Sequence, residues 1–267
     1  MHPIEHLRYV ARASGADHRL LVQETAAAIG SFGFDPSGLV TACKRILERH
    51  PTVGPLWWLA AHVLTAADPD EAAWRCVEQI SDDPTALELS HALPDEATVC
   101  VVGWPAVTGE ALARRGDCRV LVVDALDEGS GLVRRLRRSD VEAIQVPVSG
   151  LGAAAALSDV VVLEASAIGP GGFVTIQGAR AAACVAWCQE RPVWVVGGVG
   201  RLLPDALFSA LASRVLAEGD PWELDDEIVP LELATRVAGP FGVLEPAEAL
   251  AHTDTPLAAE LLKTVPF

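Results

Sequence analysis

The fold is decided by the stretch DVVVLEASAIGPGGFVTIQGARAAACVAWCQERPVWVVGGVGRLL, residues 159–203. It begins with an apolar, β-branched run, passes through a glycine-rich turn into an alanine-rich helical stretch, and ends in a second apolar run. Short strands that are apolar on both faces and joined by a helix are typical of a parallel sheet covered on both sides. We therefore expect a strand at 159–165, a helix at 178–190 and a strand at 192–198.

The same alternation extends toward the N-terminus and beyond residue 203. Short β-branched runs predict further strands at 98–103, 119–124 and 143–147, and the gaps between runs predict helices at 107–115, 129–138 and 204–216. Strands that alternate with helices, joined by right-handed crossovers, give a doubly wound α/β layer. We expect residues 93–267 to form a Rossmann-like α/β domain, with a parallel sheet and helices on both faces.

The first 92 residues have a different texture. Apolar residues recur at spacings of three and four, as in the sets that begin at Ile4 and at Leu39, and PLWWLAAHVL reads as a long apolar helix after Pro51. Asp68-Pro69-Asp70 is a plausible restart of a helix, because aspartate caps and proline suits the first turn. We expect a helical N-terminal domain over residues 1–92.

Composition excludes several classes of protein. The formal net charge is −16 and only Lys44 and Lys263 are lysines, which argues against direct binding of nucleic acid. The cluster of Arg134, Arg135, Arg137 and Arg138 is interpreted as the solvated face of a short helix. No apolar run approaches the roughly 18 residues that span a bilayer, and no signal-like segment is visible. A cytoplasmic location is expected, with no membrane contact.

The six cysteines form no CxxC pair. Cys184 and Cys188 lie one helical turn apart in the alanine-rich stretch, which reads as a buried helix, so no metal site is predicted.

Ligands of open α/β sheets bind in the crevice at the carboxyl ends of the strands. Here that rule selects the loops Gly103–Ala106, Asp124–Ser130, Ser166–Gly172 and Gly197–Arg201. The first loop reads GWPAVTG, so the GxGxxG fingerprint is missing, and GxxxxGK[ST] is absent from the chain. No nucleotide cofactor is expected.

Three segments carry a resemblance to a known family: RHPTVGPLWWL (49–59), the stretch 159–203, and ELDDEIVPLELATRVAGPFGVLEP (223–246). In this order they resemble the translation initiation factor 2B alpha/beta/delta superfamily, which includes methylthioribose-1-phosphate isomerase and ribose-1,5-bisphosphate isomerase. The resemblance implies a Rossmann-like half that assembles into a homodimer or a hetero-oligomer with related subunits. The apolar residues of Pro230–Gly242 and its flank, namely Val229, Leu231, Leu233, Val237 and Phe241, are predicted to form that interface.

The chain departs from the isomerases of that family at their catalytic places. Their cysteine after the first strand corresponds to Gly103, and the aspartate of their G-A-D motif corresponds to Ser166. Their asparagine-lysine pair becomes Thr175-Ile176, and the arginine after the second strand is missing. Cys100 lies three residues early, within the strand. Moving a proton during aldose–ketose exchange needs a positioned acid and base, which glycine and serine do not supply.

The sequence therefore favours a non-catalytic or regulatory member that binds a small ligand, sugar-phosphate or nucleotide-like, or a protein partner. The alternatives are a divergent aldose–ketose sugar-phosphate isomerase and an unrelated α/β metabolic enzyme. No catalytic residue is assigned. The predicted ligand-binding residues share a place on the crevice loops or beside them: His50, Gly103, Trp104, Glu164, Ser166, Gly171, Gly172, Gln177 and Arg201.

Within that set, the buried carboxylate of Glu164 is expected to pair with Arg201. Trp104 is predicted to point toward Ser166 and to fill the crevice, leaving too little room for a bisphosphate. The competing picture turns Trp104 outward and lines an open anion site with Arg201, His50 and Gln177.

Overall fold

A computed structural model describes residues 18–29, 36–217 and 219–262. The helix predicted around Ile4 lies outside these residues. Before residue 93 every described element is a helix: α2 (His18–Ile29), α3 (Pro36–Arg49), α4 (Gly54–Thr65), α5 (Pro69–Ser81) and α6 (Thr85–Ala92). The restart at Asp68 is confirmed, because its carboxylate accepts hydrogen bonds from the backbone N–H groups of Asp70 and Glu71.

The main sheet has seven strands in the order β10-β9-β7-β4-β1-β2-β3. All neighbours are parallel except β10, which is antiparallel to β9. The strands are β1 (Thr98–Val102), β2 (Arg119–Val123), β3 (Glu142–Val146), β4 (Val160–Glu164), β7 (Val193–Val196), β9 (Arg236–Gly239) and β10 (Gly242–Leu244). Five of them lie where the β-branched runs predict strands, so the α/β fold class is confirmed.

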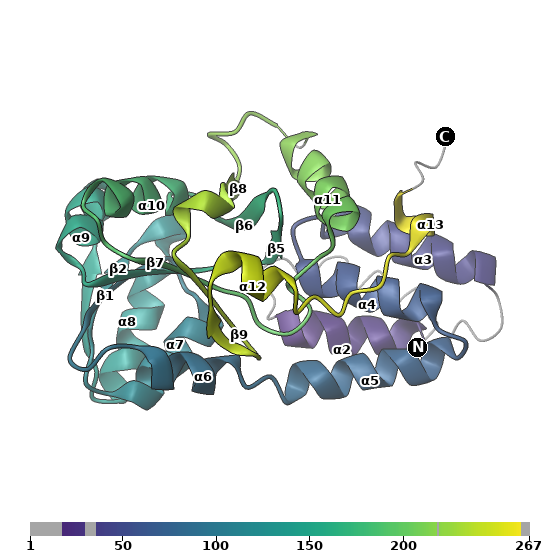
Figure 1. The fold of residues 1–267 in the computed structure, drawn as a ribbon, viewed down its shortest axis with the longest axis horizontal. Coiled ribbons are helices and arrows are strands. Elements are labelled where there is room, and N and C mark those ends of the chain that lie inside the picture. The colour runs from purple at the N-terminus through teal and green to yellow at the C-terminus, as the bar shows by residue number, and fades with distance from the viewer. Residues whose placement is uncertain (1–17, 30–35, 218, 263–267) are drawn as a thin grey trace.

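Helices cover both faces of this sheet (Figure 1). One face packs against three helices, which share an apolar core with the sheet: α6, α7 (Ala106–Arg115) and α8 (Gly129–Arg138). The opposite face is covered by α9 (Leu151–Leu157), α10 (Ala179–Cys188) and α12 (Pro246–Leu250). The sheet extends from β1 in both directions, and right-handed crossovers then place α7 and α8 on one face and α9 and α10 on the other.

A second, three-stranded antiparallel sheet is absent from the sequence prediction. It consists of β5 (Ala167–Gly169) and β6 (Gly172–Ile176), which lie between β4 and α10 in the chain, and β8 (Asp226–Val229), which follows α11. Gly172 has φ +144°, and a Cβ there would lie 2.5 Å from the carbonyl oxygen of Val229, so glycine is required where the strands meet. The small sheet lies between the two halves, since β5 contacts α4 and α11 of the helical half and β8 contacts α10 on the main sheet.

The helical core takes residues from both ends of the chain. Trp57 and Trp58 of α4 are fully buried, and α11 (Asp205–Ala217) and α13 (Ala259–Leu262) pack beside them. The guanidinium of Arg214 lies 4.5 Å from the ring centroid of Trp57. A domain boundary at residue 92 remains a prediction, since the core of the helical half includes these later helices.

The segment Pro230–Gly242 corrects a prediction. Val229, Leu231 and Val237 are buried in the core of the chain itself, and β9 pairs with β7 inside the main sheet. These three residues are used within the chain and are not available for a dimer interface, whereas Leu233 and Phe241 of the predicted set are only partly buried. None of the helices in the described ranges is long and apolar enough to cross a membrane.

Candidate functional site

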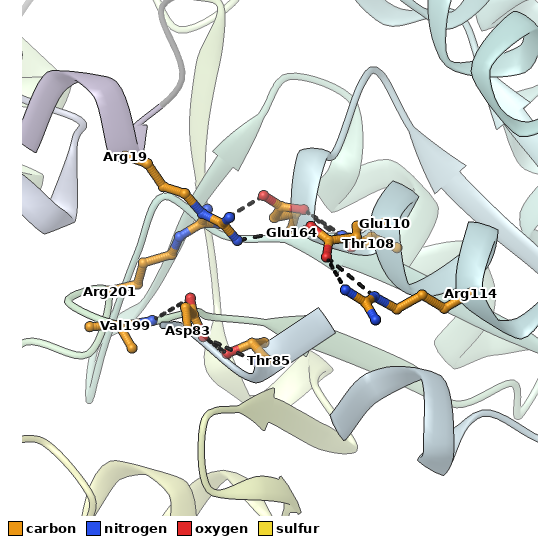
Figure 2. A network of polar contacts seen from close by, with 9 residues as sticks. All are labelled: Arg19, Asp83, Thr85, Thr108, Glu110, Arg114, Glu164, Val199 and Arg201. Carbon is orange, nitrogen blue, oxygen red and sulfur yellow. Dashed lines mark hydrogen bonds and ion pairs between the residues drawn. The ribbon is translucent and has the colours of Figure 1, made fainter. Parts of the chain in front are cut away.

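The strand order reverses between β1 and β4, and the carboxyl ends of these strands carry a buried ion pair (Figure 2). Glu164, the last residue of β4, accepts a hydrogen bond at Oε1 from Nη1 of Arg201 at 3.0 Å. The two side chains are only 11% and 9% exposed. The predicted pairing of Glu164 with Arg201 is confirmed by this contact.

The second oxygen of Glu164 is also occupied. Oε2 accepts hydrogen bonds from the backbone N–H of Thr108 at 3.0 Å and from its hydroxyl at 3.2 Å. Arg201 in turn donates to the carbonyl of Ala165 at 2.7 Å. A carboxylate held by a guanidinium and two further donors is fixed in orientation, and both of its oxygens are already engaged within the chain.

The loop that carries Arg201 is fixed by a residue far away in sequence. Asp83 accepts hydrogen bonds from the backbone N–H groups of Val199 and Thr85, each at 2.9 Å, and so joins this loop to the start of α6. On the other side Gly200, at φ +76°, packs against the indole of Trp58. The side chain of Arg201 is therefore presented by a rigid loop, and Asp83 is a site residue that sequence reasoning missed.

Gly103 and Ser166, the two positions that the sequence comparison sets against the catalytic residues of the isomerases, are both engaged in contacts within the chain. Gly103 has φ +68°, and a Cβ there would lie 2.5 Å from Cδ1 of Ile176. The hydroxyl of Ser166 donates to the carbonyl of Val174 at 3.3 Å, and its own carbonyl accepts from the N–H of Gly54 at 3.0 Å. An isoleucine thus covers the first place, and a structural hydrogen bond occupies the second.

Trp104 does not fill the crevice, so that prediction is wrong. Its indole lies against Gly131 of α8, and the side chain is 42% exposed. Gly131 lacks a side chain and leaves a flat surface for the ring on the side away from β4. Ile176 closes the crevice over β1 instead. In the sequence it stands where the isomerases of the resembled family have the lysine of their asparagine-lysine pair.

A pocket of about 120 Å³ opens beside the ion pair. Its charged lining includes Arg19, Arg135 and Arg201 together with Asp83 and Glu110. Asp83 is already bonded to the backbone, and Glu110 pairs with Arg114 at 2.8 Å and with Arg19 at 4.0 Å. The arginine cluster is exposed, as the solvated-face interpretation expects, and one of its members, Arg135, also lines this pocket.

His18 also lines the pocket. Its burial, and then the positive charges of Arg201 and His50, lower its pKa from 6.5 to about 3. Within the part of the chain that the structure describes, its Nδ1 is buried and has no hydrogen-bond partner. The imidazole is therefore neutral at physiological pH, and it adds a polar group next to the arginines.

The other predicted residues lie elsewhere. The side-chain amide of Gln177 donates to the carbonyl of Pro221 at 3.4 Å. Gly171 approaches Phe208 in the turn between β5 and β6, and Gly172 meets β8. His50 is close enough to influence the charge of His18, but it does not line the pocket. Of the nine predicted ligand residues, the pocket lining includes Arg201 alone.

Four of the six cysteines are buried and two are exposed. Cys100 is fully buried in β1, and its burial raises the thiol pKa to about 12. Cys184 and Cys188 are exposed, which corrects the prediction that they lie in a buried helix. Among the described residues no group of three or more histidine, cysteine or acidic side chains could hold a metal ion.

By its fold this is an α/β protein: a Rossmann-like sheet is joined to a helical half, and an arginine-lined pocket lies near the point where the strand order reverses. No protein-family model and no curated protein matches the chain. Solved structures do. The translation initiation factor eIF-2B of Pyrococcus horikoshii OT3 superposes with a TM-score of 0.75 at 14% identity, covering 93% of this chain and 98% of that one.

Two structures from Chaetomium thermophilum agree with this comparison. Its eIF2B beta gives a TM-score of 0.74 at 15% identity, over 99% of this chain and 93% of that chain. The tetrameric eIF2B-beta2-delta2 complex gives 0.75 at 15% identity, over 93% and 92%. The chain thus has the fold of initiation factor 2B subunits, which confirms the resemblance at the level of the fold.

Proposed function

We propose that this chain is a non-catalytic, regulatory relative of the initiation factor 2B subunits that binds a small phosphorylated ligand in the Arg201 pocket. The observation that carries the proposal is the pair of closed catalytic places beside an arginine-lined pocket. Ile176 lies over Gly103, and Ser166 donates its hydroxyl to a backbone carbonyl.

The acid–base chemistry of an isomerase finds little support here. Cys100, the cysteine nearest to the family's catalytic place in sequence, is fully buried with its pKa raised to about 12. Glu164 is held by Arg201 and Thr108 on both oxygens. A general acid or base works best with a pKa near the operating pH and within reach of the substrate. Cys100 meets neither condition, and both oxygens of Glu164 are engaged within the chain, so the isomerase alternative is the weaker one.

The pocket suits one phosphate group. Guanidinium groups bind phosphate oxygens through paired, charge-assisted hydrogen bonds, and three arginines line this space. The pocket is small, about 120 Å³, so we expect it to take one phosphate group and little more. A bisphosphate would have to leave its second phosphate outside.

Calorimetry with inorganic phosphate and then ribose 5-phosphate tests the proposal. Arg135 is exposed and makes no hydrogen bond or ion pair with the described residues, so Arg135→Ala should leave the fold intact and weaken binding roughly tenfold or more. Arg134 is its matched control, since it is exposed on the same helix but does not line the pocket. Absence of binding at millimolar phosphate, or equal losses in the two variants, would remove the proposed site.

The proposal includes a cytoplasmic location and assembly into a homodimer or a hetero-oligomer with related subunits. One of the similar structures is a tetrameric complex of eIF2B beta and delta. All six cysteines are free thiols, in keeping with a reducing compartment. The net charge of −16 supports protein or small-molecule partners over nucleic acid.

A further inference from the structure

A second cavity borders the loop that presents Arg201. Its volume is about 220 Å³, compared with about 120 Å³ for the Arg201 pocket. One wall consists of the loop Gly198–Gly200 and of Leu202, and the other consists of Pro240 and Phe241 in the turn between β9 and β10. Val199 lines both cavities, so the same loop forms a wall of each.

The polar groups of this cavity come from the segment between α12 and α13, which runs from the main sheet to the helical half (Figure 1). The ring of His252 stacks on Phe241, with the centroids 4.8 Å apart and the planes at 20°. The exposed carboxylate of Asp254 accepts a hydrogen bond at Oδ1 from the indole N–H of Trp58, at 3.2 Å. Among the described residues, Oδ2 of Asp254 has no hydrogen-bond partner. We call this cavity the Asp254 pocket.

The charge of the Asp254 pocket is opposite to that of the Arg201 pocket. Of the described residues that line it, Asp254 is the only acidic one and none is a lysine or an arginine. A carboxylate attracts a cation and repels a phosphate, and the face of an aromatic ring such as Phe241 also attracts a cation. Leu202 and Pro240 add apolar surface, which an inorganic cation would leave uncovered. The lining therefore suits a cation that carries an apolar body.

We propose that the Asp254 pocket binds a small organic ammonium ion, with its nitrogen at Oδ2 of Asp254 and its apolar body against Phe241 and Leu202. An ammonium group has up to three N–H donors, and a hydrogen bond from such a group to a carboxylate is among the stronger ones in proteins. The net charge of −16 raises the concentration of cations near the protein and so favours such a ligand over an anion.

The contacts that build this pocket also support the loop of the Arg201 pocket. The indole of Trp58, which Asp254 binds, packs against Gly200, where an added Cβ would lie 2.8 Å from Cε3 of the ring. Figure 2 shows the other support of the loop, Asp83 bonded to the backbone N–H of Val199. Two ligands of opposite charge, an ammonium ion and a phosphate, would thus lie on either side of one loop and attract each other.

We therefore expect each ligand to strengthen the binding of the other, since coupling between two sites is reciprocal. This linkage rests on the proposed phosphate site, whereas the ammonium site does not. Binding of the amine measured without phosphate consequently separates the two.

Calorimetry with 2-phenylethylamine, and with 2-phenylethanol as its uncharged match, tests the ammonium site. The alcohol should bind roughly tenfold more weakly or less, because it cannot form the ion pair. Asp254→Asn keeps an oxygen to accept the Trp58 N–H and removes the charge, so it should preserve the melting temperature and weaken amine binding roughly tenfold or more. Glu248→Gln is the matched control: Glu248 is exposed on α12 and does not line the pocket, and its change should leave amine binding as it is.

A second titration, with inorganic phosphate in the presence of saturating 2-phenylethylamine, tests the linkage. The amine should lower the dissociation constant of phosphate roughly fivefold or more in the wild type and not in Asp254→Asn. No amine binding at millimolar concentration, equal affinity for the alcohol, or equal losses in Asp254→Asn and Glu248→Gln would overturn the ammonium site. Amine binding that leaves the phosphate affinity unchanged would overturn the linkage. Protein that binds the amine and no phosphate at all would refute the proposed function and support the ammonium site.

Discussion

Replacing Gly103 with alanine tests most sharply whether Ile176 seals the first catalytic place. An alanine there must adopt φ +68°, which costs a residue with a side chain about 1–2 kcal/mol. Its Cβ would also lie 2.5 Å from Cδ1 of Ile176, and forcing that contact apart costs about 1–2 kcal/mol more. We therefore expect Gly103→Ala to lower the free energy of unfolding by about 2–4 kcal/mol.

Two companion variants separate the two costs. Gly116 has φ +80° with nothing within 4 Å of an added Cβ, so Gly116→Ala should lose only the backbone cost, about 1–2 kcal/mol. Ile176→Val removes Cδ1, the atom in conflict, at a cost of about 0.5–1.5 kcal/mol by itself. Combined with Gly103→Ala it should recover about 1 kcal/mol or more relative to the sum of the single changes.

Urea denaturation followed by tryptophan fluorescence measures all four proteins. Equal losses for Gly103→Ala and Gly116→Ala would refute the contact with Ile176. So would strict additivity in the double variant, because the two side chains would then not share the space.

Three further changes probe the site and the core. Glu164→Gln should lower the free energy of unfolding by about 3–5 kcal/mol in a thermal or urea melt, because it leaves a buried guanidinium without its carboxylate. Glu110→Gln is the control and should cost less than about 1 kcal/mol, because Glu110 belongs to an exposed ion pair. Similar losses for the two variants would contradict the buried pair. His18 has its pKa lowered to about 3, so the unfolded state binds its proton first and stability should fall as the pH drops from about 6.5 toward 3, by up to about 1.4 kcal/mol per unit. His18→Gln should flatten the unfolding free energy over that window, and an unchanged slope would count against a neutral buried imidazole. Iodoacetamide at pH 8 should label Cys184 and leave Cys100 intact by mass spectrometry, because burial raises the pKa of Cys100 to about 12; rapid labelling of Cys100 in the native protein would revive the isomerase alternative.

The sheet could be predicted from the sequence because its signal is local. The runs at β1, β2, β3, β4 and β7 are β-branched and apolar on both faces, and Pro or Gly separates several of them from the helices. The strands β5, β6 and β8 gave no comparable signal. The strands β5 and β6 form a short hairpin, but β6 pairs with β8 at least fifty positions later in the chain, as Phe173 with Val229, and only the tertiary structure brings these two strands together.

The ion pair between Glu164 and Arg201 could be predicted since a buried carboxylate needs a partner. The remaining pocket could not. His18, Asp83 and Arg135 come from three separate helical regions, and each reads in sequence as an ordinary surface or capping residue. Trp104 was assigned to the crevice by its loop, but the direction of its ring is set by the missing side chain at Gly131, which no local pattern reveals.

The central claim is that the site binds a phosphorylated ligand without converting it. Phosphorus-31 NMR of methylthioribose 1-phosphate incubated with the protein tests both parts in one sample. We predict that the substrate resonance broadens or shifts in wild type, that Arg135→Ala reduces this effect while Arg134→Ala does not, and that the ketose phosphate resonance never appears. Appearance of the ketose product above the protein-free rate, or a substrate resonance that wild-type protein leaves unchanged, would contradict the account.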